Sequence, residues 1–316
     1  MRTLLILVLL FPGWVCSQSY PSKPVRIVLP FGPGGVADIT TRTLAPRMSA
    51  GLGQQVVVEN MPSAGGIRAS ETVARADPDG HTLLLLTNGN AVSQALFKSL
   101  PYDPLNDFSM ISTVGFFSMV FVTRGDSPFK SMKDVLATAR AKPGTLNIGT
   151  ISPGGTQHLA GELFRSTAGI DAVVIPHKTT GEVVVGVRNG SLDMAVDFIA
   201  PLISGIQSGA LRPLAVSAGK RFPGLADVPT AIEAGVPGYD VASWNALAAP
   251  AKTPRGAIDR VREELIKALA NPEVQKRFAE LGVEGRSSTP EQLRDFFVSE
   301  SARWSRVVEA AKIPKQ

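Results

Sequence analysis

Short apolar runs alternate with amphipathic stretches along most of the chain. Residues 25–29, 56–58 and 83–86 are mostly aliphatic, and each run ends near glycine, proline or polar residues. The stretches between these runs have the spacing of helices. Near-continuous apolar strands separated by helices indicate a parallel sheet with both faces covered. We therefore predict an α/β fold in which a ligand binds beyond the carboxyl ends of the strands.

The same alternation continues to residue 217 and then gives way to helices. Residues 108–123 indicate two extended segments that break near Gly115, and residues 242–249 are extended again. A helix start is predicted at Thr253 and Pro254, with Thr253 as the cap. Apolar residues at helical spacing along residues 290–311 predict a last helix that packs into the core.

These elements divide into two α/β lobes, each expected to hold a mostly parallel sheet flanked by helices. The 316 residues, of which 44% are hydrophobic, suffice for two such cores. We place residues 18–121 and 246–316 in lobe 1 and residues 122–245 in lobe 2. Crossing strands would join the lobes, and hinge motion would open and close the groove between them.

Two glycine-rich turns stand about one lobe apart and share the same residue order. Pro-Gly-Gly occurs at residues 33–35, after the first apolar run, and again at residues 153–155, after an apolar run at 146–151. Glycine lets the backbone approach a ligand closely, and the N-terminus of a helix favours an anion. Either turn alone is also typical of an ordinary strand-to-helix loop. Together they predict an anion site between two lobes.

The strand ends of both lobes supply the candidate binding residues. Asp38 in the first helical turn is equally explained by its favourable interaction with the helix dipole, and His158 by a structural role. If Asp38 faces the groove, it disfavours a ligand carboxylate nearby unless water or a ligand ammonium group intervenes, and Asp197 raises the same possibility. The candidate ligand-binding residues are Phe31, Gly34, Gly35, Asp38, Asn88, Ser152, Gly154, Gly155, Thr156, His158, His177 and Asp197.

The first 17 residues have the layout of a secretory signal peptide. Arg2 precedes an apolar run at residues 4–11, and cleavage is expected after Ser17. Val15 stands where a lipoprotein needs a small residue before its cysteine. Cys16 is the only cysteine and would be removed, so the mature chain would have no disulfide and no thiol chemistry. Export without cysteine suits a bacterial periplasm.

Charge and motif content exclude several classes of function. The net charge of +5 comes from dispersed basic residues, which suits steering of small anions or simply solubility, and does not indicate a nucleic-acid groove. The three histidines are far apart, so neither a metal site nor a cofactor is expected. No G-x-S-x-G elbow is present, which disfavours a hydrolase. Neither a P-loop nor a dinucleotide fingerprint occurs.

A series of motifs from Tyr20 to the C-terminus resembles the substrate receptors of tripartite tricarboxylate transporters, often called Bug proteins. They occur in the family's order and without large gaps. The motifs are Pro30-Phe31-Gly32-Pro33-Gly34-Gly35 with Asp38, Leu52-Gly53-Gln54-Gln55-Val56-Val57-Val58-Glu59-Asn60, Gly65-Gly66, Asp77-Pro78-Asp79-Gly80-His81-Thr82-Leu83, Leu100-Pro101-Tyr102-Asp103-Pro104, Asp107-Phe108, His158-Leu159-Ala160-Gly161-Glu162-Leu163-Phe164, Leu211-Arg212-Pro213-Leu214-Ala215-Val216, Asp227-Val228-Pro229-Thr230 and Gly235-Val236-Pro237-Gly238-Tyr239.

The resemblance implies a periplasmic receptor of Venus-flytrap architecture that closes on a small organic carboxylate and passes it to membrane permease subunits. In such receptors the two glycine turns hold the carboxylate through backbone N–H groups and ordered waters, here residues 31–35 and 152–156 with Asp38 and His158 nearby. We expect a monomer without catalytic activity, cofactor or nucleic-acid partner. Two alternatives stay open: a ligand-sensing input to a sensor kinase ectodomain, and a secreted enzyme that acts on a carboxylate.

Departures from the family pattern limit what the resemblance says about the ligand. Gly32 replaces a frequent proline, and Met61 and Arg68 replace a common arginine and glycine. His177 and Thr179 stand where tyrosine and glycine are usual. We therefore expect specificity to differ at His177 and Thr179, and the ligand itself is not transferable.

Overall fold

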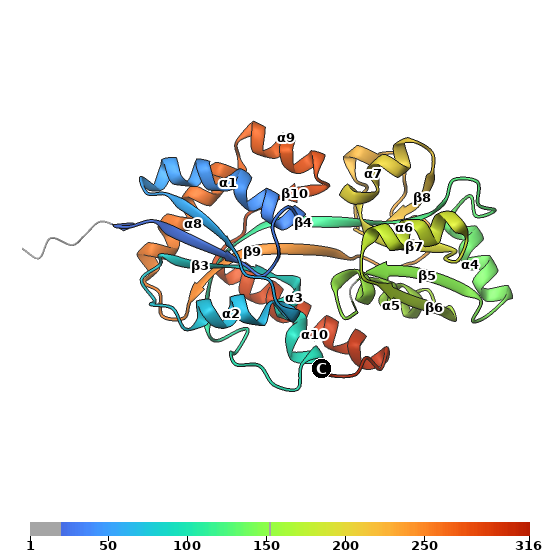
Figure 1. Ribbon diagram of the computed structural model, residues 1–316, viewed down its shortest axis with the longest axis horizontal. Coiled ribbons are helices and arrows are strands. Elements are labelled where there is room, and N and C mark those ends of the chain that lie inside the picture. The colour runs from blue at the N-terminus through green and yellow to red at the C-terminus, as the bar shows by residue number, and fades with distance from the viewer. Residues whose placement is uncertain (1–19, 152) are drawn as a thin grey trace, which may run out of the picture.

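The computed structural model describes residues 20–151 and 153–316, so the predicted signal peptide and Ser152 lie outside the described residues. In this described part of the chain, ten strands form one long, twisted sheet with the order β2-β1-β3-β9-β4-β7-β5-β6, and β8 and β10 pair with β4. Helices cover both faces of the sheet, and the molecule is elongated along the direction of the crossing strands β4 and β9 (Figure 1).

One half of the molecule is built on three parallel strands and the helices that follow them. β-Branched valine and isoleucine favour β1 and β2, and Gly53 in the left-handed conformation ends the first helix. The elements are β1 (Val25–Leu29), α1 (Val36–Leu52), β2 (Val56–Asn60), η1 (Ala64–Gly66), α2 (Ile67–Ala74), β3 (Thr82–Thr87) and α3 (Asn88–Leu96). The carboxyl ends of β1 and β3 point toward the middle of the molecule, where α1 and α3 begin.

The other half repeats the strand-helix alternation. Strands β5, β6 and β7 are parallel to one another, and β7 and β8 run antiparallel to β4. The elements are α4 (Met132–Ala141), β5 (Leu146–Ile151), α5 (Thr156–Thr167), β6 (Ala172–His177), α6 (Thr180–Asn189), β7 (Met194–Phe198), α7 (Ile199–Gln207), β8 (Leu211–Val216) and η2 (Pro223–Leu225).

Two long strands join the halves. β4 (Phe108–Arg124) and β9 (Ala242–Pro250) pair antiparallel and pass through the centre of the molecule (Figure 1). The predicted break near Gly115 is wrong, because β4 is one continuous strand. Its register against β9 shifts between Met110 and Ser112 and again between Thr113 and Gly115. Such bulges bend a strand without ending its pairing, so a local interruption of the pattern resembled a break.

The C-terminal helices return to the first half and also reach the second. They are α8 (Arg255–Leu269), α9 (Pro272–Glu280) and α10 (Pro290–Ala310), with the short strand β10 (Val283–Gly285) between the last two. The predicted cap of the first is wrong, because Pro254 occupies the N-cap position and the Thr253 hydroxyl donates to the Pro250 carbonyl at 2.8 Å. Thr289 does cap α10, where it forms a capping box with Gln292.

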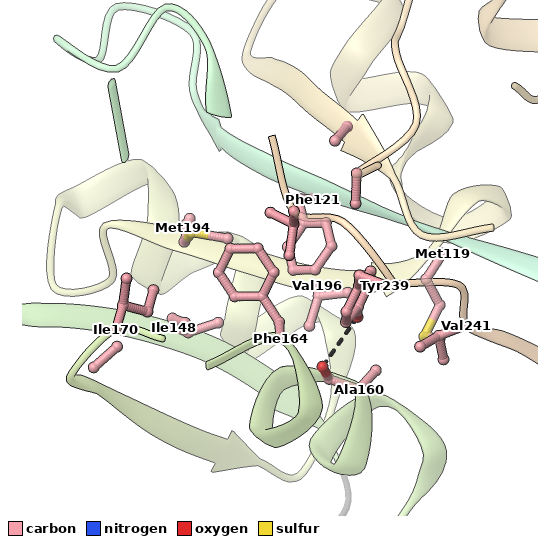
Figure 2. Close-up of a cluster of buried hydrophobic side chains, with 14 of the residues drawn as sticks. Met119, Phe121, Ile148, Ala160, Phe164, Ile170, Met194, Val196, Tyr239 and Val241 are labelled. Atoms are coloured by element: carbon pink, nitrogen blue, oxygen red, sulfur yellow. Dashed lines mark hydrogen bonds between the residues drawn. The ribbon is translucent and has the colours of Figure 1, made fainter. Parts of the chain in front are cut away.

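The core of the second half continues into α10 and α3. Phe121, Phe164 and Tyr239 pack their rings together, and the Tyr239 hydroxyl donates to the Ala160 carbonyl at 3.0 Å (Figure 2). Trp304 of α10 belongs to the same buried cluster, as does Leu96 of α3. Two helices that start in the first half therefore close one side of the boundary between the halves.

Candidate functional site

The loop between β1 and α1 is held in shape by a buried carboxylate. The Gly34 N–H donates to Asp38 Oδ2 at 2.9 Å, and Gly34 has a φ of 86°, which favours glycine. Arg42 Nε and Asn60 Nδ2 each donate to Asp38 Oδ1 at 2.9 Å. Burial alone would raise the pKa of Asp38, but these donors and the Arg42 charge hold it below its usual value. Asp38 is therefore an ionised anchor whose charge Arg42 balances.

The loop between β5 and α5 repeats this arrangement with a different side chain. The Gly154 N–H donates to His158 Nδ1 at 2.9 Å, again across four residues, and Gly154 has a φ of 75°. Because Nδ1 accepts this bond, its proton must be on Nε2 and the imidazole must be neutral. Burial lowers the pKa of His158, and Glu162, whose Oε1 lies 3.9 Å from Nε2, opposes that shift.

The second glycine of each loop stands at the N-cap of its helix. Gly35 and Gly155 have φ values of −75° and −73°, which suit any residue, and neither helix has a side-chain cap. A Cβ added at Gly35 would meet nothing within 4 Å. The fold therefore does not require glycine at Gly35, and the backbone angle does not require it at Gly155. Both helices present uncapped N–H groups and the positive end of the helix dipole, at positions that a small anion can approach closely.

Asn88 and Thr156 connect the two halves. Asn88 is the first residue of α3, is 1% exposed, and donates through Nδ2 to Thr156 Oγ1 of α5 at 3.1 Å. Asn88 Oδ1 is buried and has no hydrogen-bond partner. The helix N-termini of α3 and α5 consequently lie side by side. Leu96 of α3 also lies close to Gly154, since a Cβ there would be 3.1 Å from Leu96 Cδ1.

Asp197 is fixed at the carboxyl end of β7, next to α5 and α6. It is 1% exposed and accepts hydrogen bonds from Thr180 Oγ1, Gln157 Nε2 and the Phe198 N–H. Burial raises the pKa of Asp197, and the three donors counteract only part of that shift. Its contacts tie the N-terminal turns of α5 and α6 together, which makes it a positioning residue for both helix ends.

The remaining predicted residues stand at the edges of this group. His177 ends β6, opposite Ile151 in register, and its Nδ1 lies 3.0 Å from the Ile175 carbonyl. Since a carbonyl only accepts, Nδ1 carries a proton and Nε2 is left to interact elsewhere. Phe31 is 42% exposed, and its carbonyl accepts from Asn60 Nδ2. Neither side chain has a hydrogen bond to the other candidates within the described residues.

Asn245 belongs to the same region and was missed by the sequence analysis. It lies on β9 directly opposite Thr87, the residue before Asn88, and it is 4% exposed. Its Nδ2 is buried without a hydrogen-bond partner. The signal that could have identified it is an amide between Trp244 and Ala246 in an otherwise apolar strand. Such a residue is costly in a core and usually has a partner.

Within residues 20–151 and 153–316, no group of three or more histidine, cysteine, aspartate or glutamate side chains could hold a metal ion. None of the helices in this part of the chain combines the length and apolar character needed to cross a bilayer.

Two α/β halves, joined by crossing strands and with the N-termini of α3 and α5 in contact between them, define the class of two-lobed binding proteins. The chain matches the model of the tripartite tricarboxylate transporter family receptor over residues 40–313, and it belongs to this family. The expected resemblance is thereby confirmed.

Individual relatives support the same assignment. Protein BugT of Bordetella pertussis is 33% identical over 296 residues, covering 93% of this chain and 91% of BugT. The structure of the periplasmic binding protein BugD superposes with a TM-score of 0.78 at 32% identity, covering 94% and 100% of the two chains. R. palustris Rpa4515 with adipate gives a TM-score of 0.81 at 30% identity, again with 94% and 100% coverage. The predicted two-lobed architecture is confirmed by these neighbours.

Proposed function

We propose that this protein is a periplasmic solute receptor that captures a small organic carboxylate between its two halves. The observation that carries the proposal is the pair of uncapped helix N-termini at Gly35 and Gly155. Each begins at a glycine whose backbone angle suits any residue, and at Gly35 the surrounding space would also admit a Cβ. Close approach of a ligand explains both glycines, and free N–H groups at a helix dipole favour a carboxylate. A related receptor holds adipate, which is consistent with this ligand class.

Recognition would rely on backbone donors rather than on a cationic side chain. Asp38 is neutralised by Arg42, and His158 is neutral because its Nδ1 accepts from Gly154. Both side chains therefore shape the loops and leave the remaining N–H groups to the ligand. Closure of the halves would exclude water, which strengthens hydrogen bonds between those N–H groups and a charged ligand.

Delivery of the ligand to permease subunits of a tripartite transporter completes the proposal, and membership of the tripartite tricarboxylate transporter receptor family supports it. The receptor would act without catalysis, and the boundaries proposed for the lobes place the hinge in β4 and β9. Hinge closure is the usual way in which such receptors present a loaded state to a partner.

The experiment that tests the proposal is native mass spectrometry of the protein purified without unfolding, followed by melting shifts with mono-, di- and tricarboxylates. A ligand that binds only the folded chain raises the melting temperature as its concentration exceeds the dissociation constant. An intact carboxylate that is retained, or that stabilises the protein at micromolar concentration, supports the receptor. Release of a chemically altered product would instead show an enzyme, and no response to any carboxylate would reject the ligand class.

Passage to a permease needs its own test. Reconstituted permease vesicles should take up the labelled carboxylate only when the loaded receptor is present. Receptor carrying Gly155→Leu, which blocks the approach to the α5 N-terminus, is the matched control. Uptake that does not depend on the receptor would contradict delivery while leaving ligand capture intact.

A further inference from the structure

We propose that Asn245, on crossing strand β9, is a specificity residue that hydrogen-bonds a second polar group of the bound carboxylate. The inference rests on the proposed function and adds a ligand class to it: short carboxylates with a hydroxyl, amide or second carboxylate at the far end, in preference to those with a hydrocarbon tail. Four observations lead to this assignment.

The first observation is that the Asn245 amide is buried and unused. It is 4% exposed, and its Nδ2 has no hydrogen-bond partner. Within the described residues, its Oδ1 takes part in no hydrogen bond either. The conclusion therefore does not depend on which way the amide is turned. Leaving a buried amide unpaired is unfavourable, so such a group calls for a partner that binds.

The second observation is the face of the sheet to which Asn245 belongs. Side chains alternate between the two faces of the sheet along β9. Leu247 packs in the hydrophobic cluster that contains residues of β1 and α1. Trp244 and Ala246 pack in the cluster on the opposite face. Asn245 thus shares the face of Leu247. Val36 and Ala37, at the start of α1, cover the same cluster.

The third observation is the absence of a neighbouring side chain from β4. Asn245 pairs with Gly115, at the end of the bulged part of that strand. On its other side it pairs with Thr87, whose hydroxyl and N–H are already engaged with Asn90 Oδ1. Among the described residues, these two cross-strand neighbours consequently leave the Asn245 amide without a partner.

The fourth observation is that Asn88, the residue after Thr87, also has a buried amide atom without a hydrogen-bond partner. Its Nδ2 is bound to Thr156, while its Oδ1 is buried and unpaired. Two buried amides with unused hydrogen-bonding atoms therefore stand close in the strand pairing, since Asn245 is opposite Thr87 and Asn88 follows Thr87 at the contact between α3 and α5. An amide satisfies a hydroxyl, an amide or a carboxylate, but cannot satisfy a methyl group. A ligand whose carboxylate binds the helix N-termini would meet these amides with its other end.

The test compares Asn245→Leu with Asn90→Leu. Asn90 is equally buried, but its side chain bonds Thr87 and Ser70, so its replacement should lower the melting temperature. Asn245→Leu removes an unpaired amide and should leave the ligand-free protein as stable as the wild type or more stable. A destabilised Asn245→Leu protein would show that the amide has a structural role and would overturn the inference.

Binding is then measured by calorimetry with matched sets of straight-chain carboxylates that end in methyl, hydroxyl or carboxylate groups. The wild type should prefer the polar ends, and Asn245→Leu should weaken their binding by about 10- to 100-fold without weakening the methyl-ended compound. Equal loss across each set, or unchanged binding, would overturn the specificity role while the receptor function stands. Absence of all binding to the wild type would overturn the proposed function and this inference together.

Discussion

The Gly154 N–H donates to His158 Nδ1 at 2.9 Å, which makes the shape of one glycine loop depend on a neutral imidazole. In the other half, Asp38 Oδ2 accepts from the Gly34 N–H at the same distance and the same spacing of four residues. The two loops are thus built in the same way, because a side chain four residues on accepts from the first glycine of each. Asp38 stays ionised around neutral pH, whereas an imidazole such as that of His158 can take up a proton in mildly acidic solution. This difference predicts a pH response that originates in one loop only.

Ligand affinity should fall in mildly acidic solution. Protonation places a hydrogen on His158 Nδ1 and removes the acceptor of the Gly154 N–H. Burial lowers the pKa of His158 in the folded protein, so the imidazole is neutral at and above the ordinary histidine pKa of about 6.5, and affinity declines only as pH falls below that value. One proton limits the loss of affinity to about tenfold per pH unit.

His158→Asn is the decisive variant, measured by calorimetric titration between pH 7.5 and 5.5. Asparagine Oδ1 is bonded to Cγ as Nδ1 is, so it can accept from Gly154 but does not titrate. The pH slope should therefore flatten while affinity at pH 7.5 is kept. Burial raises the pKa of Asp197, and any contribution of that carboxyl to the slope is shared by both proteins. An unaltered slope in His158→Asn would contradict the prediction.

Removing the anchor of the first loop should destabilise the protein. Asp38→Ala leaves the Gly34 N–H, Asn60 Nδ2 and the Arg42 guanidinium without their buried acceptor. The loss of stability should be about 1–3 kcal/mol, measured by urea unfolding at neutral pH. Since the pKa of Asp38 is held low, the difference from the wild type should shrink only in strongly acidic solution. Asp295→Ala, at an exposed carboxylate of α10, is the control and should change little.

The sequence predicts these loops because their determinants are local. Pro-Gly-Gly followed by Asp38 or His158 lies within one turn and one helix, so adjacent residues specify the geometry. The contact between Asn88 and Thr156 depends on how two halves far apart in sequence come together, which no local pattern contains. Asn245 gives a single polar interruption without periodicity, and its importance emerges only from its burial and missing partner. Continuous pairing of β4 past Gly115 likewise depends on its partner β9.

The two glycines of the second loop should respond differently to substitution. Gly155→Ala fits the backbone angle, so stability should be kept while carboxylate binding weakens at least about tenfold, since a group in front of the α5 N-terminus excludes the ligand. Gly154→Ala has a φ of 75° and a Cβ only 3.1 Å from Leu96, so it should lose about 1–2 kcal/mol of stability as well. Melting curves with and without ligand separate the effects. Full binding by Gly155→Ala would argue against carboxylate capture at this helix.

Glu300 should be the most sensitive polar residue of the junction between β9 and α10. Its Oε2 accepts from the indole N–H groups of Trp244, at 3.3 Å, and Trp304, at 3.0 Å, and its Oε1 lies 3.3 Å from Arg303 Nη1. Glu300 is 5% exposed, so Glu300→Leu leaves two buried indole donors unpaired and removes the carboxylate partner of Arg303. Unfolding by urea, followed by circular dichroism, should show a loss of about 3–5 kcal/mol.

Glu300→Gln separates hydrogen bonding from charge at this junction. The glutamine oxygen can still accept from the indoles, so the loss should be clearly smaller than for Glu300→Leu. Glu309→Leu, at an exposed position near the C-terminal end of α10, should leave the free energy of unfolding within about 0.5 kcal/mol of the wild type. Trp244 precedes Asn245 on the crossing strand β9. Glu300→Leu should therefore also weaken carboxylate binding, because loss of the Trp244 hydrogen bond loosens the strand beside Asn245. Equal stability of Glu300→Leu and the wild type would show that the indoles find other acceptors, and would remove this coupling between α10 and β9.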